Sequence, residues 1–180
     1  MGYQSLTTDT LGSRNTAVGY ATLANQNFTS ATDTYNTAYG FNAGNQVTTG
    51  TQNTFIGGLA GDALQTGLGN VALGFTALGT EDASSANTAI GHSALAVQNA
   101  GTDAYNTAVG YNTGASITTG VRNTFVGGLA GDATTTADAN TALGYAALGA
   151  NTTGANNVAI GYQALELSLI HISEPTRPLR

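Results

Sequence analysis

A short unit repeats along almost the whole chain, and its regular spacing restricts what the chain can fold into. Each unit begins with an asparagine that is followed four residues later by a glycine. The units begin at Asn15, Asn36, Asn53, Asn70, Asn87, Asn106, Asn123, Asn140 and Asn157. The usual step is 53 − 36 = 17, and only two steps differ, namely 36 − 15 = 21 and 106 − 87 = 19. Self-similarity with this period predicts stacked structural repeats, in which each unit packs only against its neighbours.

Three positions between the asparagine and the glycine form columns when the units are aligned. The threonine column comes first and contains Thr16, Thr37, Thr54, Val71, Thr88, Thr107, Thr124, Thr141 and Val158. The alanine column follows and contains Ala17, Ala38, Phe55, Ala72, Ala89, Ala108, Phe125, Ala142 and Ala159. The aliphatic column is third and contains Val18, Tyr39, Ile56, Leu73, Ile90, Val109, Val126, Leu143 and Ile160. β-Branched residues favour strands, and alternation places the threonine and aliphatic columns on one strand face, opposite the alanine column.

These columns predict an all-β fold, a parallel β-solenoid of about ten coils with strands of four or five residues. The glycine closing each unit indicates positive φ or a backbone approach too close for a Cβ. The asparagines are expected to stack as an amide ladder at the turn that opens each strand. Residues 34–79 and 104–149 are almost alike, and their offset of 104 − 34 = 70 indicates a super-repeat of four coils. The glycine and asparagine content argues against a helical repeat.

An aromatic residue usually follows the invariant glycine, and this position is the ring column. Its rings are Tyr3, Tyr20, Phe41, Phe75, Tyr111, Tyr145 and Tyr162. Glycine takes the position at Gly58 and Gly128, in the two units whose alanine column holds Phe55 and Phe125. One hypothesis is that the two columns border the same space, so that the exchange conserves volume. Recent duplication of one ancestral unit explains the same pattern.

The sequence is divided into a repeat array over residues 1–166 and a tail over residues 167–180. The tail contains both prolines and one of the two histidines, and it matches none of the columns. Its segment Leu167–Arg177 resembles an in-frame translation of a transposon-type sequencing adapter, so the tail is interpreted as non-native. The array itself is expected to be a fragment.

Charge and composition exclude several classes of partner. The chain has no lysine and four arginines, and residues 1–166 have two arginines against nine acids, or 2 − 9 = −7. This balance argues against a nucleic-acid partner, which requires clustered cations. No apolar run reaches the roughly 20 residues of a membrane span, so no membrane insertion is expected. Without cysteine, the chain has neither disulfides nor thiolate metal sites.

Catalytic and metal chemistry find little support in the sequence. His92 is the only histidine before the tail and occupies the ring column, so it is interpreted as a member of an aromatic ladder. Asp62 and Asp132 sit in Gly-rich segments resembling calcium-binding repeats, but they are four coils apart and cannot share one ion. Asp33 and Asp103 are interpreted as turn residues. We therefore expect no enzyme activity and no catalytic, cofactor-binding or metal residues, and the ligand-binding residues stay unknown.

The unit resembles a known repeat, as at Asn70-Val71-Ala72-Leu73-Gly74 and Asn157-Val158-Ala159-Ile160-Gly161. It is similar to the head repeat of trimeric autotransporter adhesins and to repeats in long tail fibres of bacteriophages. The resemblance covers nearly all of residues 2–165 and implies a left-handed parallel β-roll, with three chains packed around one axis. The adhesin unit is usually shorter than the unit of this chain, so the spacing favours the tail-fibre branch or a longer outer loop.

The resemblance implies an extracellular structural and adhesive fibre on a phage virion or a bacterial surface. It would attach to a host cell-surface receptor or to extracellular matrix. A homotrimer is expected, with the small side chains of the alanine column allowing close approach of partner chains. The alternative is an ice-binding β-solenoid that presents a threonine rank. Valine at positions 71 and 158 and the aliphatic neighbouring column count against ice binding.

Deletion of residues 167–180 is predicted to leave the melting temperature unchanged, because these side chains match none of the solenoid columns. Circular dichroism melts of the full chain and the truncated chain test this prediction. A fall of several degrees on truncation would instead identify the tail as a cap of the last coil.

Overall fold

The computed structural model describes residues 2–166 as one solenoid with no helix in that range; the expected tail, residues 167–180, lies outside the described residues. Nine three-residue strands build the main sheet: β2 (Thr16–Val18), β4 (Thr37–Tyr39), β5 (Thr54–Ile56), β6 (Val71–Leu73), β7 (Thr88–Ile90), β8 (Thr107–Val109), β9 (Thr124–Val126), β10 (Thr141–Leu143) and β11 (Val158–Ile160). Two further strands, β1 (Gly12–Ser13) and β3 (Thr32–Asp33), form a small separate sheet.

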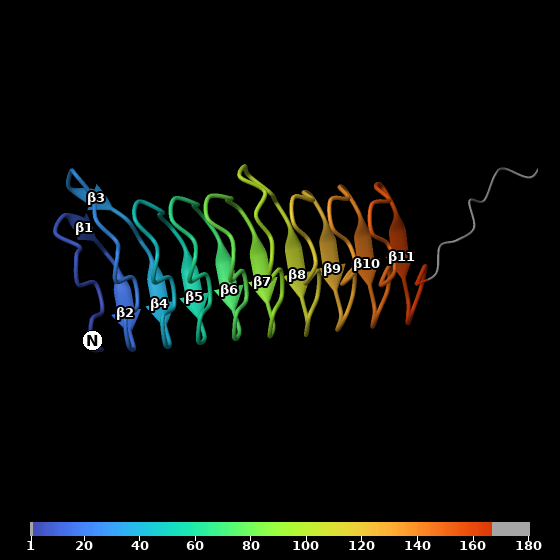
Figure 1. Cartoon of the computed structure of the whole chain (residues 1–180), viewed down its shortest axis with the longest axis horizontal. Helices are drawn as coiled ribbons and strands as arrows, with labels where there is room; N and C mark the ends of the chain where they lie inside the picture. Colours follow the sequence, from blue (N-terminus) through green and yellow to red (C-terminus); the bar gives the residue numbers. More distant parts are fainter. Residues whose placement is uncertain (1, 167–180) are drawn as a thin grey trace, which may run out of the picture.

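The nine strands lie side by side in chain order, and every neighbouring pair is parallel (Figure 1). Equivalent columns pair in register, so that Thr54 lies beside Val71 and Phe55 beside Ala72. Strand spacing of about 4.8 Å makes the sheet roughly 40 Å long over its eight steps. The predicted parallel β-solenoid is confirmed, although each strand has three residues rather than four or five.

The asparagines that open successive units form a hydrogen-bonded ladder, and most of them are buried. The backbone N–H of Asn53 donates to Oδ1 of Asn36 at 2.9 Å, and the same bond joins Asn70 to Asn53. The Nδ2 of Asn53 donates to the carbonyl oxygen of Gly67, 14 residues further on, at 2.9 Å. An amide such as that of Asn53 therefore links one coil to the next and also ties the start of its own coil to the end of that coil, whereas the Nδ2 groups of Asn87 and Asn140 make no such bond. The expected asparagine ladder is confirmed.

The invariant glycine closes each strand under two constraints at once. Its φ lies between 125° and 141° in all nine units, a region that side chains rarely adopt. A Cβ at Gly57 would also lie 2.6 Å from the carbonyl oxygen of Gly74 in the next coil. Both reasons expected for glycine at this column therefore apply.

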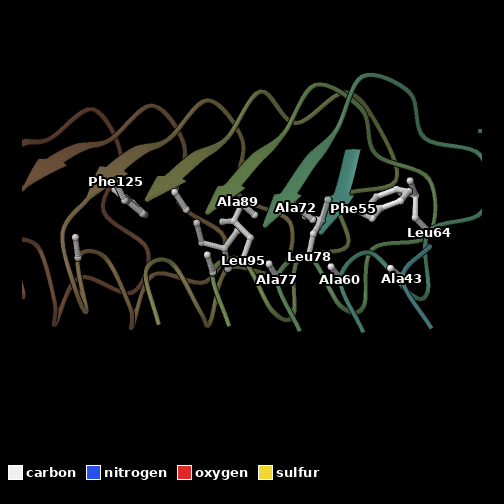
Figure 2. Packing of buried hydrophobic residues seen from close by; sticks show 14 of the residues in the cluster. Ala43, Phe55, Ala60, Leu64, Ala72, Ala77, Leu78, Ala89, Leu95 and Phe125 are labelled. Atoms are coloured by element: carbon white, nitrogen blue, oxygen red, sulfur yellow. The ribbon is translucent and has the colours of Figure 1, made fainter. Parts of the chain in front are cut away.

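The alanine column points into the solenoid, which corrects the role expected for it. Ala38, Ala72 and Ala89 are 0% exposed, and Figure 2 shows the column facing side chains from the opposite wall of the coil. That wall consists of small residues such as Ala60 and Ala77, each followed by an inward residue such as Leu78. The alanines are small because the two walls of one chain approach closely. They are therefore not available as a contact surface for partner chains.

The phenylalanines of the alanine column are accommodated by a different exchange from the one hypothesised. Phe55 is fully buried, whereas the ring column lies outside, so Phe55 and Gly58 do not border the same space. The space for Phe55 comes from Gly44 and Gly61, which occupy an inner column where most coils have leucine. A Cβ at Gly44 would lie 2.6 Å from the Phe55 ring. The volume exchange is thus between phenylalanine and leucine across the interior.

The two longer coils accommodate their extra residues as loops that rise above the row of strands (Figure 1). In the first longer coil, the buried residue Gln26 occupies the inner position that an apolar residue, such as Leu64, occupies in other coils. The Nε2 of Gln26 donates to Asp9 at 2.6 Å, and its Oε1 accepts from Asn36 at 2.8 Å. The same arrangement joins Glu81, Gln98 and Asn106 in the second. These polar side chains therefore add to the asparagine ladder, which continues across both longer coils, where the loop leaves the core.

Phe55→Ala is predicted to lower the free energy of unfolding by about 3 kcal/mol, because it empties a fully buried site. Adding Gly61→Leu is expected to restore a large part of this loss, since the coil then carries the alanine and leucine pair of its neighbour, Ala72 and Leu78. Leu78 already has a φ of 52°, close to the 57° of Gly61, so the backbone admits leucine there.

Urea denaturation of the three proteins measures the effect. Adding Gly58→Tyr to Phe55→Ala is the matched control and is expected to restore nothing, because position 58 faces outward. Rescue by tyrosine at position 58, with none by leucine at position 61, would contradict the corrected packing.

Candidate interaction surface

The outer face of the main sheet presents large apolar side chains along its whole length. The threonine and aliphatic columns point away from the interior, and Leu73, Leu143 and Ile160 are 43%, 48% and 67% exposed. The outer sheet face, as these two columns are named below, runs across all nine strands in register. Contiguous exposed apolar surface of this kind is typical of a protein–protein contact.

A second exposed row runs along the corner that follows each strand. The ring column stacks in three runs, with centroids 5.6 Å apart between Tyr3 and Tyr20 and 5.3 Å between Tyr20 and Phe41. His92 lies 5.5 Å from Phe75 and 5.4 Å from Tyr111. The interpretation of His92 as a member of the aromatic ladder is therefore confirmed. The third run is the stacked pair Tyr145 and Tyr162.

The ladder is interrupted at Gly58 and Gly128, which separate the three runs. Neither glycine has positive φ, in contrast to the invariant glycine before each of them. A Cβ at Gly58 would lie 3.4 Å from the Phe75 ring, and one at Gly128 would lie 3.6 Å from the Tyr145 ring. These are ordinary contact distances or close to them, so neither backbone strain nor crowding imposes glycine at these two positions.

An outward pocket of about 240 Å³ lies next to the second interruption. Tyr145 lines it together with Asp132, Gly149, Gln163 and Glu166. Asp132, Gly149 and Glu166 occupy the same column in three successive coils, so the missing side chain of Gly149 leaves space between the two acids. We call this the Tyr145 pocket.

Two half-buried carboxyl groups, those of Asp62 and Asp132, have raised pKa values. Burial raises the pKa of Asp62 above its usual value. Burial also raises the pKa of Asp132, backbone hydrogen bonds partly oppose it, and the charge of Glu166 adds to the increase. Each carboxyl lies against a glycine of the next coil, Gly79 for Asp62 and Gly149 for Asp132. As the sequence indicated, the two acids are four coils apart.

The longer loops expose one tyrosine each, beside an acid. The hydroxyl of Tyr35 lies 3.5 Å from Asp33, and that of Tyr105 lies 3.3 Å from Asp103. Asp33 belongs to β3 rather than to a turn, because its segment pairs with Ser13 in the small sheet. A hydrogen bond from Ser13, and then one from Arg14, lowers the pKa of Asp33. Asp103 lies in the irregular part of its loop, outside any strand.

Residues 2–166 contain neither a metal-ligating cluster nor a membrane-spanning helix. No group of three or more His, Cys, Asp or Glu side chains in that range is placed to hold a metal ion. The same residues include no helix of the length and apolarity that a bilayer crossing requires. The chemistry that the surface offers is apolar contact along the sheet and ring stacking with hydrogen bonding at its corner.

Comparison of the chain with protein-family models, with curated proteins and with solved structures gives no match.

The sequence did not reveal which residues form this surface. Alternation grouped the threonine and aliphatic columns on one face, but the apolar character of that face suggested the interior. One signal was present: phenylalanine enters the alanine column only in coils with glycine at the inner leucine position, as at Phe125 and Gly131. A size exchange of this kind marks the column that packs across a closed interior.

Asp132→Asn is predicted to raise the melting temperature at pH 7, because burial disfavours the charged form of this carboxyl. A raised folded-state pKa means that the native state binds the proton more readily than the unfolded chain. Native stability therefore increases as the pH falls through that pKa, and the advantage of asparagine shrinks over the same range.

Thermal melts from pH 7 down to about pH 3, below the ordinary aspartate pKa, check the prediction. Asp103→Asn on the exposed loop is the control and is expected to change little. If Asp132→Asn melted at a lower temperature at pH 7, the carboxylate would be stabilising rather than costly.

Proposed function

We propose that the chain is a segment of an extracellular, homotrimeric fibre that serves structural support and adhesion. Its context would be the head of a bacterial trimeric adhesin or a phage tail fibre attached to a host receptor or matrix. The observation that carries the proposal is the outer sheet face, on which the aliphatic column is exposed in six of the nine strands and partly exposed in β7, β8 and β9.

The energetic case rests on the length of that face. Burying the exposed part of a half-exposed leucine or isoleucine contributes on the order of 1 kcal/mol. The six exposed positions of the column in each chain add up to a contribution comparable to the free-energy cost of bringing chains together. The repeat keeps every position in register, so one favourable contact between chains is repeated at each coil along the rod.

A threefold arrangement suits the shape of this surface. Each chain presents one straight, narrow apolar face on a rod roughly 40 Å long. Three identical faces turned toward a common axis bury one another's apolar side chains in a closed assembly, and closed symmetry is usual for homo-oligomers. The resemblance of the repeat to trimeric adhesin heads and tail fibres supplies the number three. In such a trimer, the long loops with Tyr35 and Tyr105 are available for contact with a receptor.

Ice binding is the second candidate, and one feature of the structure favours it. The threonine column points outward at a regular spacing, as an ice-binding rank requires, rather than into a core. Val71 and Val158 interrupt this rank, and its neighbouring rank is aliphatic rather than threonine. Thermal hysteresis measured on the full chain separates the two candidates.

The full chain is predicted to sediment as a trimer of about three times 18.0 kDa. Leu73→Glu combined with Leu143→Glu is expected to yield mostly monomer, because charge on the outer sheet face opposes its burial between chains. Sedimentation velocity measures the mass, and far-ultraviolet circular dichroism confirms that the β signal is retained.

Gln65→Glu adds the same kind of charge at an exposed position outside the strands and is expected to remain a trimer. A wild-type chain that stays monomeric at micromolar concentration with full β signal would refute the trimer. It would leave a self-sufficient solenoid, and thermal hysteresis in that monomer would support ice binding.

A further inference from the structure

The interruption of the aromatic ladder at Gly128 uncovers one face of the Tyr145 ring. Tyr162 covers the other face, with centroids 5.6 Å apart. Tyr20 and His92, by contrast, each have a ring neighbour on both sides. Two ladder steps of about 5.5 Å leave roughly 11 Å between the rings that flank the gap, which is the space of one missing ring.

The polar groups around Tyr145 define what kind of ring would fit. The carboxylates of Asp132 and Glu166 and the amide of Gln163 line the same pocket. The half-buried Asp132 carboxyl interacts with the backbone N–H groups of Asp132 and Ala133, and no side chain among residues 2–166 donates a hydrogen bond to it. A ligand with hydroxyl groups would add side-on donors to this carboxylate, and the resulting hydrogen bonds would be charge-assisted.

Three other ligand classes fit less well. A metal ion lacks a third acidic or histidine ligand among the described residues. An anion such as a phosphate would meet two carboxylates and no cation in the pocket. A purely aromatic partner would cover Tyr145 but offer no hydrogen-bond donor to Asp132.

We propose that the Tyr145 pocket binds one pyranose ring of a neutral saccharide. The C–H face of the sugar packs on the ring face that Gly128 leaves open, and its hydroxyls donate to Asp132, which belongs to the same coil as Gly128. The assignment rests on the proposed adhesive function and names the chemical class of its receptor, but it does not require the trimer.

The structure holds a second, simpler copy of this arrangement four coils earlier. Gly58 uncovers the Phe75 ring, and Asp62 lies against Gly79 as Asp132 lies against Gly149. Ala96 takes the place of Glu166, and Ser93 takes that of Gln163. The Ser93 hydroxyl is already hydrogen-bonded to Thr76 and His92. The copy therefore offers fewer groups to a sugar, and we expect it to bind more weakly.

Saturation-transfer NMR on the full chain tests the proposal, with glucose, galactose, mannose and N-acetylglucosamine oligosaccharides as probes. At least one probe is expected to bind, and Gly128→Tyr is expected to weaken it at least tenfold by filling the gap with a ladder ring. Tyrosine occupies this column in other coils, so the melting temperature should hold. Asp132→Asn, which keeps the shape but removes the charge, is expected to weaken binding as well.

Gly58→Tyr is the matched control, because it fills the equivalent gap of the weaker copy and should leave most of the binding. Unchanged binding in Gly128→Tyr, or binding of none of the probes, would overturn the proposal while the sedimentation test of the fibre stands by itself. Calcium alone binding to the wild type and lost in Asp132→Asn would replace the sugar with a cation.

Discussion

The asparagine ladder is the interaction on which the rest of this structure depends. Strands of only three residues make too few hydrogen bonds to set their own register. Each buried amide of the ladder accepts from the next coil, as Asn36 does from Asn53, and five of them, Asn53 included, also donate to the end of their own coil. The ladder therefore sets the position of one coil on the next and also closes these coils. The invariant glycine completes this, because its missing Cβ allows the carbonyl of the next coil to approach.

The close approach of the two walls explains the small residues of the interior. Large inward side chains come from either of two facing columns, and two coils have a small residue in both, Ala38 with Gly44 and Ala108 with Gly114. Most coils use leucine opposite alanine, as at Leu78 and Ala72, whereas two use phenylalanine opposite glycine. The space left beside these residues is small, and the side chains of the aliphatic column lie on the outer face. The exposed apolar face is thus a consequence of a narrow interior.

This surplus of outward apolar groups connects the fold to the function proposed for it. A solenoid that exposes apolar side chains along its sheet gains free energy when association with copies of itself buries them. The corner beside that face carries the aromatic ladder, and its two interruptions occur where no steric constraint requires glycine. A costly half-buried carboxyl near each interruption is further reason to regard these places as functional.

The sequence by itself determined the period, the parallel stacking, the role of the invariant glycine, the asparagine ladder and the place of His92 in the ring column. Each of these follows from a residue type that recurs at a fixed position. The tertiary structure alone decided which strand face is inside. Alternation shows that the threonine and aliphatic columns share a face, but the direction of that face depends on where the chain closes. The pairing of Phe55 with Gly44 and Gly61 settles that direction, because the three residues meet only when the alanine column points inward.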